Sequence, residues 1–233
     1  MYSIMSSLSR QICQLLLLAG ATLLLSGQGR PAAPTAILVS IEQRHLWYVS
    51  GRDVIFDAPV AVGISEDFVF DGKRYDFDTP RGVRRILKKE TDPVWTVPLW
   101  HYYEKAANKG LEVIHIETGK VYALGDDTHI QVRENQVGRV NRFGNFWPFT
   151  PGIEIIFDNK IYVPPMGTAQ RQVSDVLGPF KLDMGEGYLI HGTHEDNEDS
   201  IGEAVSHGCI RMHNHDLKIL YDMVAVGTTV YIN

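Results

Sequence analysis

Hydrophobic and polar residues alternate along the chain from residue 36, a pattern typical of β-strands that bury one face. The first alternating stretch covers residues 37–41. Short polar or glycine-containing turns separate it from residues 45–50 and 54–56, and residues 59–63 continue the series. We therefore expect the folded part of the protein to begin with a meander of short strands.

Further strand-like stretches occur through the rest of the chain, with turn-forming residues between them. They cover residues 111–117, 121–124, 129–133, 154–157, 161–163, 188–190 and 229–232. Two segments have helical patterns: residues 101–109, which end at Gly110, and residues 216–224, for which Asn214 is the expected N-cap. The pattern as a whole predicts a mainly β protein with a few short helices.

The first thirty residues follow a different pattern. After Arg10, the 11-residue apolar run LLLLAGATLLL extends from Leu15 to Leu25. Its length suits the apolar region of a signal peptide and is short for a membrane-spanning helix. We therefore predict that residues 1–30 are a signal peptide or membrane anchor, rather than a buried helix, and that residues 31–35 form a linker. The protein would then act in the periplasm or cell wall.

Composition and charge narrow the function further. The chain has 233 residues, of which 44% are hydrophobic and 21% charged, as in ordinary globular proteins. Its net charge of −6 argues against non-specific nucleic-acid binding. The two cysteines, Cys13 and Cys209, are too few for a disulfide scaffold or a zinc site made of cysteines alone. Because Cys13 lies in the predicted export segment, the folded part carries a lone thiol.

Reactive side chains are concentrated around that thiol. Residues 191–194 read HGTH, residues 206–211 read SHGCIR, and two more histidines follow at 213 and 215. A cysteine nucleophile needs a base or cation close by, because the thiolate is the attacking species. It also needs donors for the oxyanion that forms when an acyl carbon is attacked. The backbone amides of Gly208 and Cys209 are natural candidates for those donors.

The residues alone leave the identity of the base open. His191 can reach the thiol from a neighbouring strand, and the loop to His207 is long enough to return beside it. His207 is the rival, since residues two apart in an extended segment point the same way as Cys209. A metal site and an inert buried thiol are further alternatives. The metal ligands would come from a set of N and S donors, namely His191, His194, His207, Cys209, His213 and His215.

The segment from His191 to Met212, HGTHEDNEDSIGEAVSHGCIRM, resembles the catalytic signature of the L,D-transpeptidase (YkuD-type) domain family. That signature is a histidine followed by Gly-Thr, a loop with Ser-Ile-Gly, and then Ser-His-Gly-Cys with a hydrophobic residue and Arg or Asn. The resemblance extends over residues 37–98 and 176–233. It includes the Thr-Pro turn at residues 78–82 and the sequence LGPF at 177–180.

The resemblance implies a β-rich catalytic domain over residues 36–233 that transfers acyl groups on peptidoglycan stem peptides and uses no metal or organic cofactor. Cys209 would attack the carbonyl of the third residue of a tetrapeptide, a diamino acid, and release the terminal D-alanine. An amine of a second stem would then resolve the thioester. The family also implies that carbapenems acylate this cysteine.

The family's general base falls on His191, whose orientation would be helped by a backbone carbonyl near Gly192. His207 and Gly208 would form the oxyanion region with Cys209. Ser206 and Arg211 would shape the site.

Three other functions remain as alternatives. The same thioester could end in water, as in an L,D-carboxypeptidase or a hydrolase that releases wall-attached protein. The chain could also be a non-catalytic cell-wall-binding module.

Two features depart from typical members of the family. About 70 residues, near 100–170, separate the Thr-Pro turn region from residue 177, and their own β pattern predicts an inserted β-rich lobe. This lobe could cover the site and set the choice of acceptor, or it could be a purely structural extension. The loop after His191 is acidic. Such a loop could be only a solvated surface. Our sharper expectation is that Thr193, Glu195 and Asp196 contact substrate, with the acidic groups attracting the ammonium group of the diamino acid.

Overall fold

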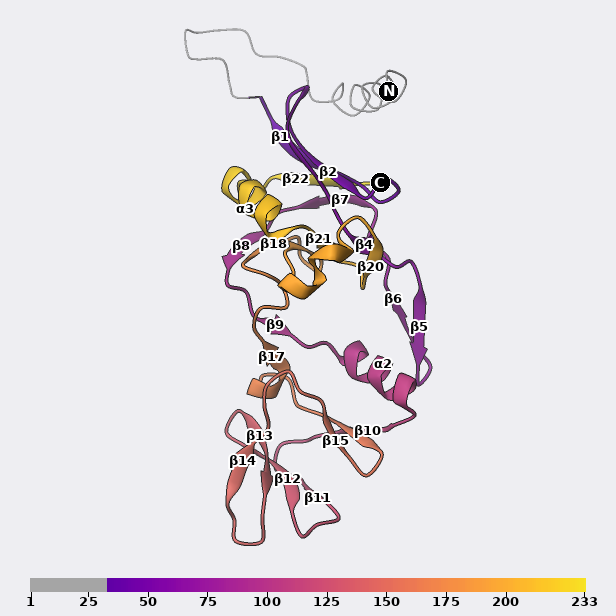
Figure 1. Ribbon diagram of the computed structural model, residues 1–233, viewed down its shortest axis with the longest axis vertical. Helices are drawn as coiled ribbons and strands as arrows, with labels where there is room; N and C mark the ends of the chain where they lie inside the picture. The colour runs from indigo at the N-terminus through magenta and orange to yellow at the C-terminus, as the bar shows by residue number, and fades with distance from the viewer. Residues whose placement is uncertain (1–32) are drawn as a thin grey trace.

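The computed structural model describes residues 33–233, and Figure 1 shows an elongated molecule with two ends of different character. The strands from the beginning and the end of the chain meet in the upper part. The strands of residues 112–163 form a lobe at the lower end. The predicted export segment and the first residues of the linker lie outside the described residues. Within the described residues, no helix is both long and apolar enough to cross a membrane.

The predicted meander forms most of a five-stranded sheet, here called the terminal sheet. Its strand order is β3-β2-β1-β22-β7. β1, β2 and β3 pair antiparallel, whereas the last strand of the chain, β22, lies parallel to β1. The strands are β1 (Thr35–Ser40), β2 (His45–Ser50), β3 (Asp53–Pro59), β22 (Thr229–Ile232) and β7 (Gly82–Arg85).

A four-stranded sheet, here called the catalytic sheet, lies beside the terminal sheet and has the order β21-β19-β18-β8. β18 pairs antiparallel with both β8 and β19, and β19 pairs parallel with β21. Its strands are β8 (Lys88–Thr91), β18 (Phe180–Asp183), β19 (Leu189–His191) and β21 (Ile210–Arg211). The segments HGTH and SHGCIR therefore end or begin on two adjacent strands.

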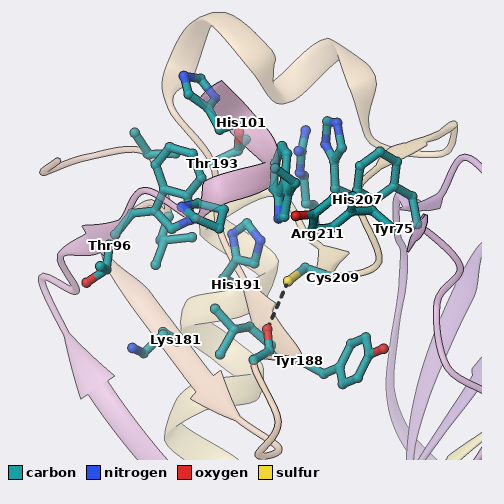
Figure 2. Close-up of a pocket in the computed structure, with 18 of the residues that line it drawn as sticks. Tyr75, Thr96, His101, Lys181, Tyr188, His191, Thr193, His207, Cys209 and Arg211 are labelled. Carbon is teal, nitrogen blue, oxygen red and sulfur yellow. Dashed lines mark hydrogen bonds between the residues drawn. The ribbon is translucent and has the colours of Figure 1, made fainter. Parts of the chain in front are cut away.

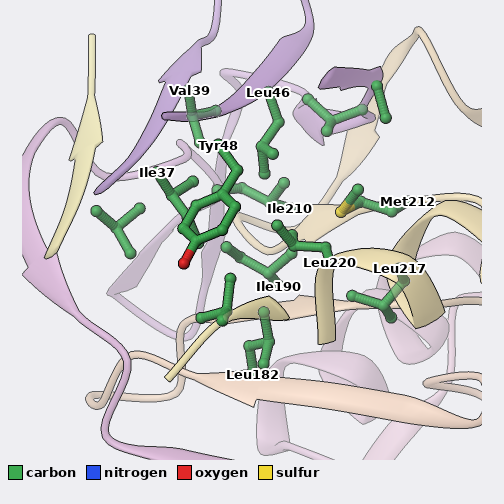
Figure 3. Close-up of a cluster of buried hydrophobic side chains, with 14 of the residues drawn as sticks. Ile37, Val39, Leu46, Tyr48, Leu182, Ile190, Ile210, Met212, Leu217 and Leu220 are labelled. Carbon is green, nitrogen blue, oxygen red and sulfur yellow. The ribbon is translucent and has the colours of Figure 1, made fainter. Parts of the chain in front are cut away.

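The two sheets and one helix enclose the main hydrophobic core, part of which is drawn in Figure 3. α3 (Asn214–Met223) packs against this core through its apolar face. Each element contributes residues at alternate or helical spacing, as the sequence pattern requires. The buried members include Ile37, Val39, Leu46, Tyr48, Leu182, Ile190, Ile210, Met212, Leu217 and Leu220.

The lower lobe has hydrophobic clusters of its own. A four-stranded sheet of order β11-β12-β13-β14 and a three-stranded sheet of order β10-β16-β15 enclose a cluster centred on Ile130 and Val137, both fully buried. A second cluster lies under α2 (Leu99–Lys109). The strands are β10 (Glu112–His115), β11 (Val121–Ala123), β12 (His129–Arg133), β13 (Gln136–Val140), β14 (Phe146–Pro148), β15 (Ile155–Phe157) and β16 (Lys160–Val163).

Short elements connect the lobe to the catalytic sheet. The β5–β6 hairpin extends to α2. The chain segment that enters the lobe contains β9, the segment that leaves it contains β17, and these two short strands pair with each other. Two short 3-10 helices, η1 and η2, complete the described elements. Their bounds are β5 (Asp67–Phe70), β6 (Lys73–Asp76), β9 (Trp95–Thr96), η1 (Ala169–Arg171), β17 (Gln172–Val173) and η2 (Glu195–Ser200).

Most predicted elements are confirmed with shifts of one or two residues at their ends. α2 ends at Gly110, which has the left-handed conformation that glycine favours. Two details differ. Residues 59–63 do not continue the meander, because β4 (Val62–Gly63) pairs instead with β20 (Ala204–Ser206). Asn214 is not the N-cap of α3, since His213 holds that position and the Asn214 side chain bonds elsewhere.

Candidate active site

A cleft of about 730 Å³ lies between the catalytic sheet and the elements that lead into the lobe. Figure 2 shows that side chains from both sides point into it. The sheet side of the cleft is formed by Lys181, Asp183, Tyr188, Leu189, His191, Cys209 and Arg211. The opposite side is rich in aromatic rings, which belong to Tyr75, Phe77, Trp95, Trp100 and His101. The cleft is large enough for several peptide residues.

The parallel pairing of β19 with β21 places the histidine and the cysteine on one face. Ile190 pairs with Ile210, and both point into the main core with no exposed surface. Because neighbouring residues in a strand point to opposite faces, His191 and Arg211 point away from the core and into the cleft. Cys209, two residues before Arg211, lines the same cleft (Figure 2).

The imidazole of His191 is held in one orientation and kept neutral. Its Nδ1 lies 2.6 Å from the carbonyl oxygen of Gly192, so Nδ1–H donates to that carbonyl and Nε2 is left as an acceptor. Burial lowers the pKa of His191 to about 3, and the positive charges of Arg211 and Lys181 act in the same direction. The ring is therefore a neutral base at ordinary pH.

The thiol of Cys209 is also neutral at rest. Burial raises the pKa of Cys209, against smaller lowering effects of the Leu189 backbone and of the Arg211 charge. Its Sγ lies 3.7 Å from the carbonyl oxygen of Gly187, drawn as the dashed line in Figure 2. A neutral thiol beside a neutral imidazole can transfer its proton as it attacks, without a standing thiolate.

The backbone around Cys209 is fixed by Ser206, which has no exposed surface. The Ser206 hydroxyl donates to the carbonyl of Cys209 at 2.5 Å and accepts from the N–H of Gly208 at 3.2 Å. The N–H of Gly208 is thus already engaged. Within residues 33–233, none of the loop or side-chain hydrogen bonds occupies the N–H of Cys209, which makes it a candidate donor to an oxyanion.

Residues 206–209 do not form the extended segment that the sequence suggested. Gly208 has a φ of 107°, a conformation that side chains rarely adopt, and the chain bends there. The bend breaks the two-residue alternation, so the ring of His207 does not follow the direction of Cys209. It lies instead against the ring of Trp100 at the start of α2.

The acidic loop contributes less to the cleft than expected. Thr193 lines the cleft, but Glu195 and Asp196 are not among its lining residues, and the Asp196 side chain is 89% exposed. Glu198 points to α3, where its carboxylate accepts from the backbone N–H of Asn214 at 2.9 Å. This contact places a negative charge at the helix N-terminus, where the peptide dipoles favour it.

Asn214 supports the backbone next to His191, a role that the sequence did not indicate. Its side chain accepts from the N–H of Thr193 at 3.0 Å and donates to the carbonyl of Thr193 at 2.9 Å. A Cβ on Gly192 would lie only 2.1 Å from the Asn214 oxygen, so glycine is required there. The start of α3 therefore fixes the backbone that follows His191.

The proposed metal ligands are not brought together. Within residues 33–233, no three His, Cys, Asp or Glu side chains are grouped closely enough to hold a metal ion. His194, His213 and His215 do not line the cleft, and His213 faces the carboxylate of Glu198 at 3.6 Å.

Comparison with known proteins adds an independent observation. A family model described as the L,D-transpeptidase catalytic domain (YkuD) matches residues 34–232. The probable L,D-transpeptidase YbiS of Escherichia coli K12 is 34% identical over 131 residues, which cover 56% of this chain and 40% of YbiS. The putative L,D-transpeptidase YkuD of Bacillus subtilis 168 is 48% identical over 65 residues, which cover 28% of this chain and 38% of that protein.

The matched stretches thus span less than half the length of either relative. Among solved structures, an L,D-transpeptidase from Mycobacterium smegmatis aligns with 86% of this chain and 59% of its own, at 16% identity and a TM-score of 0.44. The family match covers nearly all of the described residues, including β19, which ends at His191, and Cys209, which directly precedes β21. The chain belongs to the L,D-transpeptidase catalytic domain family.

Proposed function

We propose that the protein is an exported cysteine acyltransferase that cross-links peptidoglycan stem peptides by L,D-transpeptidation through a thioester on Cys209. The observation that supports this most is the arrangement on β19 and β21. There, a neutral imidazole and the free thiol of the described residues face the same cleft. Family membership supports the substrate class. The apolar run in residues 15–25 supports export.

In the first half-reaction, Nε2 of His191 takes the thiol proton as Sγ of Cys209 attacks the carbonyl carbon of the third stem residue. A C–S bond forms and the carbonyl oxygen becomes an oxyanion, which the N–H of Cys209 would receive. The C–N bond to the terminal D-alanine then breaks, and His191 returns the proton to the leaving amine. The products are a thioester and free D-alanine.

In the second half-reaction, the amine of an acceptor stem attacks the thioester. His191 takes a proton from that amine and delivers it to the departing sulfur, so that an amide forms and the thiol is restored. The carbonyl of Gly192 would hold the imidazole in the tautomer that both steps need. Arg211 would disfavour a long-lived imidazolium, which favours rapid return of the proton.

The remaining site residues would support the backbone around Cys209 or act on the bound stem. Ser206 would fix the conformation of the Gly208–Cys209 peptide, because it bonds to both residues. Since the N–H of Gly208 is engaged, the N–H of Cys209 is the better candidate for the main oxyanion donor. Thr193 would contact the bound stem from the cleft wall, whereas Glu195 and Asp196 would act only through long-range attraction of an ammonium group.

The test is a Cys209→Ala variant assayed on defined tetrapeptide-stem muropeptides. The substitution should abolish product formation while circular dichroism stays unchanged, because it removes only the sulfur. The wild type should give 3→3 cross-linked dimers. If the wild type instead gave only stems that had lost the terminal D-alanine, the carboxypeptidase alternative would hold. Release of protein that is attached to the cell wall would indicate the hydrolase.

Intact-mass measurement with a carbapenem separates catalysis from mere wall binding. One adduct per chain on wild-type protein, absent from Cys209→Ala, is the expected result. A wild type that takes up no carbapenem and yields no product from muropeptides would favour the wall-binding module. Full activity in a chelator would exclude the metal alternative.

A further inference from the structure

The side chain of His207 is enclosed by three groups from outside its own loop. Its ring stacks on that of Trp100, with centroids 4.2 Å apart and planes 16° from parallel. Phe77 meets the same ring edge-on, with centroids 4.5 Å apart. The Nε2 of His207 lies 3.4 Å from a carboxylate oxygen of Glu104. Stacking and the contact with the carboxylate together define both the plane and the rotation of the ring.

Two of these three groups come from α2, the helix with which the lower lobe begins. Trp100 and Glu104 are four residues apart, so they lie on one face of the helix, one turn from each other. The opposite side of α2 is anchored in the lobe, since Tyr102 and Ala106 are buried in the same cluster as Ile161 of β16. The lobe therefore anchors the helix whose other face contacts His207.

His207 directly precedes the reacting part of the loop. Gly208 has a φ of 107°, and a Cβ there would approach the carbonyl oxygen of Asp78 to 3.0 Å. Glycine adopts this bend without strain but can adopt other conformations as readily, so the bend has to be held from both sides if the N–H of Cys209 is to point into the cleft. Ser206 holds it from the core side, and the enclosed ring of His207 holds it from the lobe side.

We propose that Trp100 and Glu104 are positioning residues, through which the lobe holds His207 and thereby aims the backbone N–H of Cys209 at the oxyanion. The proposal rests on the acyl transfer proposed above. It gives the lobe a role in the chemical step that does not require the lobe to touch the substrate. It also assigns His207 a mechanical task and leaves the proton transfers to His191.

The test compares two reactions of the same thiol in the full-length chain. Acylation by a carbapenem passes through an oxyanion, whereas alkylation by iodoacetamide replaces iodide at a saturated carbon and forms none. Trp100→Leu and Glu104→Ala should each lower the maximal acylation rate constant about 10- to 100-fold, because small errors in the position of catalytic groups have effects of this size. The carbapenem concentration for half-maximal rate and the alkylation rate should change less than about threefold, because neither depends on stabilising an oxyanion.

Conservative variants sharpen the result. Trp100→Phe keeps a ring to stack on, and Glu104→Gln keeps an oxygen that accepts from Nε2–H, so both should retain most of the acylation rate. Tyr103→Leu is the matched control on the same helix, because its ring stacks on Phe70 and not on His207. Glu112→Gln is the control for charge, since Glu112 lies on β10 and faces Lys160.

The ring of Trp100 should also shift the proton resonances of the His207 ring upfield in NMR spectra, and Trp100→Leu should remove that shift. Unchanged acylation in Trp100→Leu and Glu104→Ala would overturn the proposal while leaving the proposed acyl transfer intact. Equal losses of acylation and alkylation would also overturn it, since they would indicate general disorder of the cleft. A wild-type protein that is alkylated but never acylated would overturn both the acyl transfer and this role for the lobe.

Discussion

Burial of His191 makes its protonation differ between the folded and the unfolded chain. Its pKa is lowered to about 3 in the folded protein, against 6.5 for an ordinary histidine. Between these two pH values, the unfolded chain binds a proton at this residue and the folded chain does not. The free energy of unfolding should therefore fall as the pH falls from 6.5 towards 3, by up to about 1.4 kcal/mol per pH unit from this group.

Urea unfolding at several pH values between 4 and 7 measures that slope. His191→Asn removes the titrating group and keeps a side-chain N–H near the carbonyl of Gly192. The unfolding free energy of this variant should therefore fall less steeply as the pH falls. The difference in slope from the wild type should correspond to about one bound proton. The control is His215→Gln, because His215 is exposed on α3. Equal slopes in wild type and His191→Asn would show that His191 is not buried in the neutral form.

At the residue scale, the sequence indicated the proposed reacting groups but not the side chains that surround them. Cys209 and His191 could be proposed because they stand in recognisable strings, HGTH and SHGCIR. Trp100 and Glu104 lie more than a hundred residues from His207, and no local pattern relates them to it. The residues alone left both His191 and His207 as candidate bases, because the bend at Gly208, with its φ of 107°, is a property of the folded loop.

At the scale of elements, the N-terminus of α3 and the end of β19 depend on each other through one side chain. Asn214 makes two hydrogen bonds with the backbone of Thr193, which is only 3% exposed. Asn214→Ala would leave both backbone groups buried without partners. We expect a loss of about 1–3 kcal/mol in unfolding free energy.

Urea unfolding at pH 7 checks this prediction, and the carbapenem acylation rate should fall as well, because the carbonyl of Gly192 orients His191. His215→Ala serves as the matched control, one residue further along the same helix and exposed. If the two variants were equally stable, the bonds to Thr193 would contribute nothing to the fold.

The elements that the sequence predicted well are those with a clear apolar face. The alternation in residues 37–50 identified β1 and β2, because both bury one face in the main core. The β5–β6 hairpin was missed, since four of the eight residues in its strands are charged and neither strand contributes to that core. β4 was placed in the meander because pairing with β20, some 140 residues later, leaves no trace in the local pattern.

At the scale of the whole molecule, the hydrophobic residues form separate clusters and not one continuous core. The main cluster joins the terminal sheet, the catalytic sheet and α3, whereas the lobe encloses two clusters of its own. α2 belongs to the lobe's second cluster and also faces the cleft. This arrangement lets the lobe position groups at the cleft without sharing the core that holds the catalytic strands.

Because the clusters are separate, we expect the lobe and the terminal sheet to unfold locally and independently of each other. Ile130 in β12 and Ile37 in β1 are the same residue type, and both have no exposed surface, but they lie in different clusters. Replacing either by alanine should leave a cavity that costs about 2–5 kcal/mol. Ile130→Ala should accelerate amide hydrogen exchange in β10 to β16 and leave the terminal sheet protected, because only the lobe loses packing.

Ile37→Ala should do the reverse, with faster exchange in β1, β2 and β22 and an unchanged lobe. Hydrogen exchange followed by mass spectrometry of peptides from both regions, in both variants and the wild type, measures the effect. Matched acceleration across the whole chain in both variants would mean that the clusters unfold as a single unit. In that case the lobe could not respond to changes at the cleft independently, and its stability would be inseparable from that of the strands that carry His191 and Cys209.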